Sequence, residues 1–252
     1  MSDNKYWNQS VPWSFKEEKL TYDQRRKLRY DLQDYMLEMI PFGNWGGKNV
    51  LEIGCGTGID SVEFARNCAN VTSIDFADES VKRTTETCGE AGLTGSVLLR
   101  PANATELPSD SFDLIYSYGV LHHISAVDKV LEEITRLEKP DGQGIFMVYN
   151  KDSLLNAYSI LFLHRGEGDE HELATRYSER KPGNPYTKLY SAEEAAQLFS
   201  KYFEDVRIET VFTVIDTPAQ RKLKIESPAE LGWHHLIFCR RPIKATSKSL
   251  QS

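Results

Sequence analysis

Three glycines follow the first strongly apolar run of the chain, and their spacing points directly to chemistry. In the segment NVLEIGCGTGID, residues 49–60, Gly54, Gly56 and Gly58 lie within five positions. Glycine loses more backbone freedom on folding than any other residue, so this density is costly. Removing the side chains allows a ligand to come close to the main chain. The segment therefore predicts a ligand site lined by backbone.

The spacing of these glycines disfavours a dinucleotide. The dinucleotide fingerprint is G-x-G-x-x-G, whereas this segment reads G-C-G-T-G and continues to Asp60. An acid at the start of the following helix suits the helix dipole but would repel a pyrophosphate. Asp75 ends the next apolar run, where a carboxylate can accept two hydrogen bonds from a ribose diol. We therefore expect a ligand that contains a ribose but is not a dinucleotide.

Polar residues also follow the third and fourth apolar runs. Asn103 and Ala104 come after the third run, where the edge of an adenine would lie, and Ser117 closes the fourth run. His122 follows just beyond it, and an unperturbed histidine titrates near neutral pH, which suits a general base. His122 is therefore the best candidate for a base. The alternative is that it caps a loop or packs against the ligand.

The elements that must position these residues are short apolar strands separated by helical patterns. We predict strands at 49–54, 70–75, 96–100, 112–120, 144–150, 204–214 and 234–242, and helices at 21–40, 60–68, 78–89, 128–138 and 191–203. Capping residues mark the starts of two helices, with Thr21 and Gln24 in a capping box and Ser191 as an N-cap. The alternation of strands and helices indicates a doubly wound α/β domain whose sheet is covered on both faces.

Five motifs, in this order, resemble those of the class I S-adenosylmethionine-dependent methyltransferase family. They are LEIGCGTG, SID, ANATELP, SFDLIYSYGVLHHI and EEITRLEKPDGQG, between residues 51 and 144. A looser resemblance to a subgroup covers the N-terminal aromatic segment and GNPYTKLYSAEEAAQLF. The resemblance implies a Rossmann-like sheet of about seven strands, mostly parallel with an antiparallel final strand. An N-terminal helical arm and a cap insert would accompany this sheet.

The resemblance implies a role for each matched position. Glu52 and the backbone of the glycine turn would hold the methionine part of the cofactor, while Asp75 would bind the ribose hydroxyls. Phe76 would lie against the adenine face, Asn103 would accept the adenine amino group, and the amide of Ala104 would donate to the ring. Family members more often carry Asp than Asn at position 103, and an amide oxygen can still accept this bond. The implied cofactor contacts are Glu52, Gly54, Cys55, Gly56, Gly58, Asp75, Phe76, Asn103, Ala104, Ser117 and Tyr118.

Methyl transfer requires alignment of an acceptor with a methyl group that is already electrophilic, and an oxygen or nitrogen acceptor also needs a base. The family's geometry would place His122 at the methyl side of the cofactor, where residues at the end of the fifth strand could orient it.

Aromatic residues before the first helix would form a lid, with ordinary packing as the alternative. The insert at 151–190 would cap the acceptor, with a dimerisation element as the alternative. The predicted acceptor residues are Tyr6, Trp7, Trp13, Tyr149, Asn150, Tyr186 and Tyr190.

These patterns divide the chain into successive parts. We predict an N-terminal arm and helix (1–44), an S-adenosylmethionine-binding core (45–150), the cap insert (151–190), the C-terminal part of the core sheet (191–243) and a disordered tail (244–252). Tyrosines and two arginines in the cap favour a polar or anionic small-molecule acceptor. The atom that is methylated stays open among oxygen, nitrogen, sulfur and carbon.

Composition and missing motifs exclude other classes. The 252 residues are 40% hydrophobic and 27% charged, with 30 basic and 37 acidic residues and a net charge of −7, which disfavours nucleic-acid binding. The chain lacks a signal-peptide pattern and an apolar run that could span a membrane, so we expect a cytoplasmic protein. Its histidines, cysteines and acids lack metal-ligand spacing, so we expect no metal. We expect a monomer or a homodimer. It also lacks the Asn/Asp-Pro-Pro-Tyr/Phe and Pro-Cys motifs of nucleic-acid methyltransferases. A nucleic-acid or protein methyltransferase and a non-catalytic cofactor-binding module are the alternatives.

Overall fold

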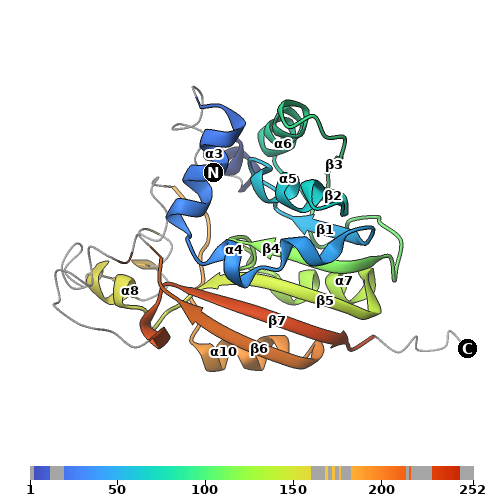
Figure 1. Cartoon of the computed structure of the whole chain (residues 1–252). Helices are drawn as coiled ribbons and strands as arrows, with labels where there is room; N and C mark the ends of the chain where they lie inside the picture. The colour runs from blue at the N-terminus through green and yellow to red at the C-terminus, as the bar shows by residue number, and fades with distance from the viewer. Residues whose placement is uncertain are drawn as a thin grey trace, which may run out of the picture.

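The computed structural model describes most of the chain, and Figure 1 shows its arrangement. The described residues are 3–11, 20–159, 168–169, 172–173, 176, 183–213, 216 and 229–244. Trp13, most of the predicted cap insert between 160 and 182, and residues 245–252 of the predicted tail lie outside them. Lys244, the first residue of that predicted tail, is instead anchored on the core, because its Nζ donates to the Thr135 carbonyl at 2.7 Å.

A seven-stranded sheet forms the centre of the molecule, in the order β3-β2-β1-β4-β5-β7-β6 (Figure 1). Its strands are β1 (Asn49–Ile53), β2 (Asn70–Asp75), β3 (Ser96–Leu99), β4 (Phe112–Tyr118), β5 (Glu138–Tyr149), β6 (Phe203–Val211) and β7 (His234–Pro242). The first five pair in parallel, and β7 pairs antiparallel with both β5 and β6. The predicted fold class is confirmed. β7 lies between β5 and β6. Because it runs antiparallel to β5, its first residue, His234, lies opposite Tyr149 at the carboxyl end of that strand.

The helices alternate with these strands as predicted. They are α1 (Asp3–Gln9), α3 (Tyr22–Leu32), α4 (Met36–Met39), α5 (Ile59–Arg66), α6 (Asp78–Glu90), α7 (Val127–Leu137), α8 (Leu154–Tyr158) and α10 (Ala192–Phe199), with short 3-10 turns η1 (Phe42–Trp45), η2 (Leu121–His123) and η4 (Ala229–Leu231). Thr21 with Gln24, and Ser191 with Glu194, form complete capping boxes. The helix predicted at 21–40 is interrupted between α3 and α4, and this break directs the Tyr35 hydroxyl toward His234 on the sheet, at 2.7 Å from Nδ1.

The core lies on both faces of the sheet because adjacent residues of each strand point to opposite sides. On one face, Ile115 packs with Ile134 of α7 and Phe199 of α10. On the other, Leu114 packs with Val62 of α5. β5 starts at Glu138 rather than at the predicted 144, with a register shift opposite Phe112–Leu114. Among the described residues, no helix has the length and apolar character to cross a bilayer.

Candidate functional site

The glycine turn connects β1 to α5 in a conformation that only glycine adopts easily. Gly54, Gly56 and Gly58 have φ values of 79°, 55° and 77°, in the left-handed region. A Cβ on Gly54 would lie 2.2 Å from Val120 Cγ2, and a Cβ on Gly58 would lie 2.8 Å from the Thr84 backbone of α6. Gly58 therefore allows α5 and α6 to pack closely, whereas Gly54 allows the loop after β4 to approach the turn.

A cavity of about 280 Å³ opens at the carboxyl ends of β1, β2 and β4, beside this turn. This is the edge where doubly wound sheets bind ligands. Its wall includes Gly54, Asp75, Phe76, Asn103, Val120 and His123. Four of these six were predicted as cofactor contacts, and the six lie at the ends of four different strands, β1 to β4. The fold therefore brings together the residues expected at the nucleoside end of a ligand.

Asp75 lies at the end of β2 with its carboxylate held by the backbone. Oδ2 accepts the amide of Gly56 at 3.2 Å, and Oδ1 accepts the amide of Ala77 at 3.0 Å. Burial raises the pKa of Asp75, while these amides and the Ser80 hydroxyl oppose the shift. Each carboxylate oxygen can accept a further bond, because it offers more than one lone pair. The carboxylate is therefore preoriented at the cavity wall.

The segment after β3 meets the prediction in part. Asn103 is exposed and lines the cavity, as does the 38% exposed side chain of Phe76. The Ala104 amide, predicted to donate to a ring, instead donates to the Pro101 carbonyl at 3.3 Å, and Ala104 does not line the cavity. Pro101 does line it, so the turn that engages this amide places a different residue at the wall.

Three other predicted cofactor residues lie behind the wall and support it. Glu52 is 4% exposed and accepts a hydrogen bond from the Ser61 hydroxyl of α5, and burial raises the pKa of Glu52 well above its usual range. The Ser117 hydroxyl donates to the Ile53 carbonyl at 3.0 Å, joining β4 to β1. Cys55 is buried, and burial raises the pKa of its thiol. None of the three lines the cavity in this structure.

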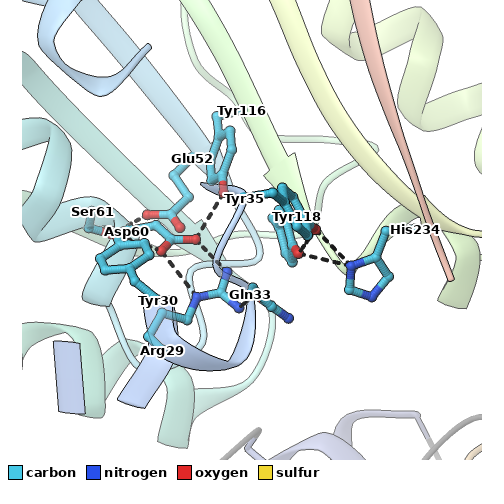
Figure 2. A network of polar contacts seen from close by, with 10 residues as sticks. All are labelled: Arg29, Tyr30, Gln33, Tyr35, Glu52, Asp60, Ser61, Tyr116, Tyr118 and His234. Carbon is cyan, nitrogen blue, oxygen red and sulfur yellow. Dashed lines mark hydrogen bonds and ion pairs between the residues drawn. The ribbon is translucent and has the colours of Figure 1, made fainter. Parts of the chain in front are cut away.

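Asp60, at the start of α5, is the centre of a buried polar network (Figure 2). Arg29 of α3 donates to Asp60 Oδ2 from Nη2 at 2.6 Å and to Oδ1 from Nε at 3.2 Å. The hydroxyls of Tyr30 and Tyr116 donate to the same carboxylate at 3.1 and 2.9 Å. This acid, which the sequence placed at a helix N-terminus, therefore fixes α3 against α5 and β4.

Tyr118, predicted as a cofactor contact, belongs to the adjoining part of this network (Figure 2). Its hydroxyl bonds the Tyr35 hydroxyl and lies 3.2 Å from His234 Nδ1, and the Arg29 guanidinium lies 4.5 Å from its ring centroid. Burial, together with the charge of Arg29, lowers the pKa of His234 to about 3. The imidazole of His234 is therefore neutral at physiological pH. Tyr118 does not line the cavity.

The two adjacent histidines of η2 have different surroundings. His122 is fully buried beside Tyr149, with ring centroids 3.9 Å apart, and neither ring nitrogen has a hydrogen-bond partner among the described residues. Burial lowers the pKa of His122 well below its usual range. His123 lines the cavity, and its Nδ1 lies 3.0 Å from the Tyr186 carbonyl. His122 was expected to face the cofactor, but it is His123 that lines the cavity in this structure.

A segment of the predicted cap insert, residues 183–190, runs along the carboxyl edge of the sheet. The Lys188 amide donates to the His122 carbonyl at 2.9 Å, and the Tyr190 amide donates to the Tyr149 carbonyl at 3.0 Å. Tyr190 is 2% exposed, while Tyr186 is half-buried. The segment is therefore joined to the ends of β4 and β5, where an acceptor would be expected.

The end of β5 is occupied by packing and backbone contacts. Asn150 donates from Nδ2 to the carbonyls of Glu230 and Gly232 at 2.9 and 2.8 Å, and its Oδ1 accepts the Asp152 amide at 2.9 Å. Tyr149 stacks on Trp233 with centroids 4.5 Å apart. Asn150 is thus a structural bridge in this structure, and the prediction that it orients His122 finds no contact.

The N-terminal aromatic residues have different surroundings in the structure. Tyr6 is 4% exposed, whereas Trp7 lines the cavity and packs on His123 with centroids 4.9 Å apart.

Sequence reasoning missed His123 and Arg100 at the cavity wall. The adjacent pair of histidines was the one signal for His123, but no periodicity in so short a turn identifies which ring faces the ligand. The described part of the chain contains no group of three His, Cys, Asp or Glu residues that could hold a metal.

Comparison with known proteins points to one family. Residues 51–146 match the family described as methyltransferase domain. The ubiquinone biosynthesis O-methyltransferase of Actinobacillus pleuropneumoniae is 32% identical over 122 residues, covering 46% of this chain and 51% of the relative. The 27-O-demethylrifamycin SV methyltransferase of Amycolatopsis mediterranei is 27% identical over 179 residues, covering 66% of this chain and 62% of the relative. The chain thus spans between half and two thirds of the length of these relatives.

A solved structure extends the similarity of fold. Phosphoethanolamine N-methyltransferase 2 of Haemonchus contortus, in complex with S-adenosyl-L-methionine, superposes with a TM-score of 0.63. The match covers 96% of this chain and 60% of that chain at 16% identity, so it speaks for the fold alone.

Proposed function

Because residues 51–146 match the methyltransferase-domain family, we propose that this protein is a class I S-adenosylmethionine-dependent enzyme that transfers a methyl group to a small-molecule acceptor. The observation that carries the proposal is the cavity beside the glycine turn, with the Asp75 carboxylate and Asn103 on its wall. Bound S-adenosylmethionine supplies an electrophilic methyl group on a sulfonium. The protein then has to bind the cofactor and the acceptor, orient them toward each other, and exclude water from the site.

The residues on the cavity wall fit this cofactor. The Asp75 carboxylate, held at both oxygens by backbone amides, is suited to a ribose diol. The Asn103 side chain offers both a donor and an acceptor for an adenine edge. Gly54 lets Val120 of the facing cavity wall approach the turn, since a Cβ at position 54 would lie 2.2 Å from Val120 Cγ2.

We propose a hydroxyl oxygen as the acceptor atom. Two relatives are named as methyltransferases of oxygen, one in ubiquinone biosynthesis and one acting on 27-O-demethylrifamycin SV. His123 lies on the cavity wall at the carboxyl edge of the sheet, where a hydroxyl acceptor would meet it. The half-buried Tyr186 hydroxyl lies in the segment above this edge.

His123 is the proposed proton acceptor for that hydroxyl. The Tyr186 backbone carbonyl can only accept a hydrogen bond, so the 3.0 Å contact assigns the ring proton to Nδ1. With the ring proton on Nδ1, Nε2 carries the lone pair. The Thr187 hydroxyl, 2.9 Å from the same Nδ1, also holds the ring in place. An imidazole held in one orientation at the cavity wall is suited to act as a general base.

A binding experiment with one matched control tests the cofactor assignment. Asp75→Ala should weaken the binding of S-adenosylhomocysteine by about 2–4 kcal/mol, because charged acceptors make the stronger hydrogen bonds. Glu86→Ala removes an exposed carboxylate from α6 and should leave the affinity unchanged. Isothermal titration calorimetry measures both. Equal affinity for Asp75→Ala and the unmodified protein would contradict the assignment.

A turnover experiment tests the activity itself. The protein is incubated with S-adenosylmethionine and a panel of hydroxylated small molecules, and S-adenosylhomocysteine is quantified. We expect acceptor-dependent formation of S-adenosylhomocysteine that Asp75→Ala reduces in proportion to its loss of affinity. Tight cofactor binding without turnover on any acceptor class would favour a non-catalytic binding module.

A further inference from the structure

The short helix α1 contributes Trp7 to the cavity wall and is bonded to the loop after β2. Asn4 Nδ2 donates to the Phe76 carbonyl at 3.3 Å. Asn8 Oδ1 accepts the Glu79 amide at 2.9 Å, in the first turn of α6. Phe76 itself lines the cavity. One rim of the nucleoside end is therefore connected directly to α1.

The other side of α1 contacts the opposite rim. The Trp7 indole packs on His123 of the loop after β4, with ring centroids 4.9 Å apart. Tyr6 packs edge-on against Trp7 at 5.1 Å, and a Cβ on Gly183 of the cap segment would lie 3.9 Å from the Tyr6 ring. Seven residues of helix thus join the loops that follow β2 and β4. The cavity lies between these loops.

Trp7 shares the cavity with Asp75 and Asn103, which mark its nucleoside end. We propose that Trp7 is a cofactor-binding residue and that α1 is a latch, which closes over the nucleoside part of S-adenosylmethionine. This inference rests on the proposed function and changes the role expected for the N-terminal aromatics, from the acceptor to the cofactor. A bound nucleoside leaves this cavity only after α1 loses its aromatic and hydrogen-bonding contacts with the two rims. The latch therefore lowers the dissociation rate of the cofactor.

Dissociation kinetics of the full-length protein test the latch. S-adenosylhomocysteine is bound and then displaced in a stopped-flow experiment. Trp7→Ala should raise the dissociation rate constant roughly 5- to 100-fold, the range that follows from removing an aromatic contact with a base. Asn8→Ala, which removes the bond to α6, should raise it in the same direction. Lys5→Ala, an exposed position on the same helix, is the matched control and should change it less than about twofold.

A truncated ligand identifies which end of the cofactor the latch covers. 5′-Methylthioadenosine keeps the nucleoside but lacks the amino and carboxylate groups of methionine. If α1 covers the nucleoside, Trp7→Ala should weaken the binding of both ligands by the same factor. A loss seen with S-adenosylhomocysteine alone would place α1 at the methionine end and overturn the proposal.

Two further outcomes separate this inference from the proposed function. If the unmodified protein does not bind S-adenosylhomocysteine, the proposed function fails. If it binds in an Asp75-dependent manner, but Trp7→Ala and Asn8→Ala leave dissociation unchanged and raise only the KM of the acceptor, the latch alone is wrong. Thermal unfolding of each variant checks that it is folded, and Trp7→Leu replaces Trp7→Ala where it is not.

Discussion

His122 and His123 are adjacent in η2, yet their rings lie in different surroundings. His122 is enclosed by Tyr149 and His123, and its two nitrogens find no hydrogen-bond partner among the described residues. His123 reaches the cavity, and two oxygens of the cap segment lie close to its Nδ1. Burial lowers the pKa of His122, so its imidazole stays neutral, and His122 does not line the cavity. Only His123 combines access with a defined tautomer.

The two histidines should therefore differ in their effect on turnover. His123→Ala should lower kcat by about 10²–10⁴-fold, as expected for the loss of a general base, with little change in cofactor affinity. His122→Leu should keep kcat within about tenfold, because replacing an unpaired buried polar group by an apolar one of similar size is nearly neutral. Steady-state kinetics at saturating cofactor measure both. A larger loss in His122→Leu than in His123→Ala would return the catalytic role to His122.

At the level of elements, three ion pairs connect α3 to α5, and the two that Arg29 and Arg26 form differ in burial. Arg29 pairs with Asp60, with side chains that are 16% and 5% exposed, and two tyrosine hydroxyls complete the site. Arg26 pairs with Glu63 one turn away, with side chains that are 32% and 10% exposed. Removing one partner of a buried pair leaves an uncompensated charge, whereas a more exposed pair contributes little. The Arg29–Asp60 pair should therefore dominate the attachment of α3.

Urea unfolding of two matched variants tests this ranking. Arg29→Met should lower the free energy of unfolding by about 3–5 kcal/mol, because Asp60 is left buried with its charge unpaired. Arg26→Met should cause a smaller loss, because Arg26 is more exposed and water reaches this pair more easily. Adding Asp60→Leu to Arg29→Met should restore part of the loss, since it removes the orphaned charge. Equal destabilisation by the two arginine variants would show that burial does not separate the two pairs.

For the molecule as a whole, Glu138 links stability to pH. It is fully buried at the start of β5, and neither carboxylate oxygen has a hydrogen-bond partner among the described residues. Burial raises the pKa of Glu138 to about 8, against the opposing charge of Lys244. Between its unfolded pKa, about 4.3, and pH 8, the folded state holds a proton that the unfolded state has released. Stability must therefore fall as the pH rises through this window.

The variant Glu138→Gln isolates this effect from other titrating groups. Glutamine is neutral at every pH, so the variant should gain stability relative to the unmodified protein between pH 5 and pH 8, by up to about 1.4 kcal/mol per pH unit. Above pH 8 the difference should level off. Urea unfolding at pH 5, 6.5, 8 and 9 measures the difference. A difference that is constant with pH would mean that Glu138 is ionised in the folded state.

The sequence by itself determined the sheet and one part of the site. Apolar runs of strand length and helical periodicity are local properties, so β2 and β7 have the predicted bounds and the capping boxes at Thr21 and Ser191 are present. The glycine turn and Asp75 were also predictable. Each lies at the end of its own strand, and parallel strands bring their carboxyl ends to one edge.

The tertiary structure alone decided which side chains meet at that edge. His122 and His123 are neighbours in the short turn η2, yet the ring of His122 is buried and the ring of His123 lines the cavity. Packing of His122 against Tyr149 decides which of the two rings is buried. His234 reaches Tyr35 across 199 positions because β7 inserts between β5 and β6. Trp7 reaches His123 because α1 is bonded to the loop after β2. Such contacts depend on how distant elements pack, and no local periodicity encodes them.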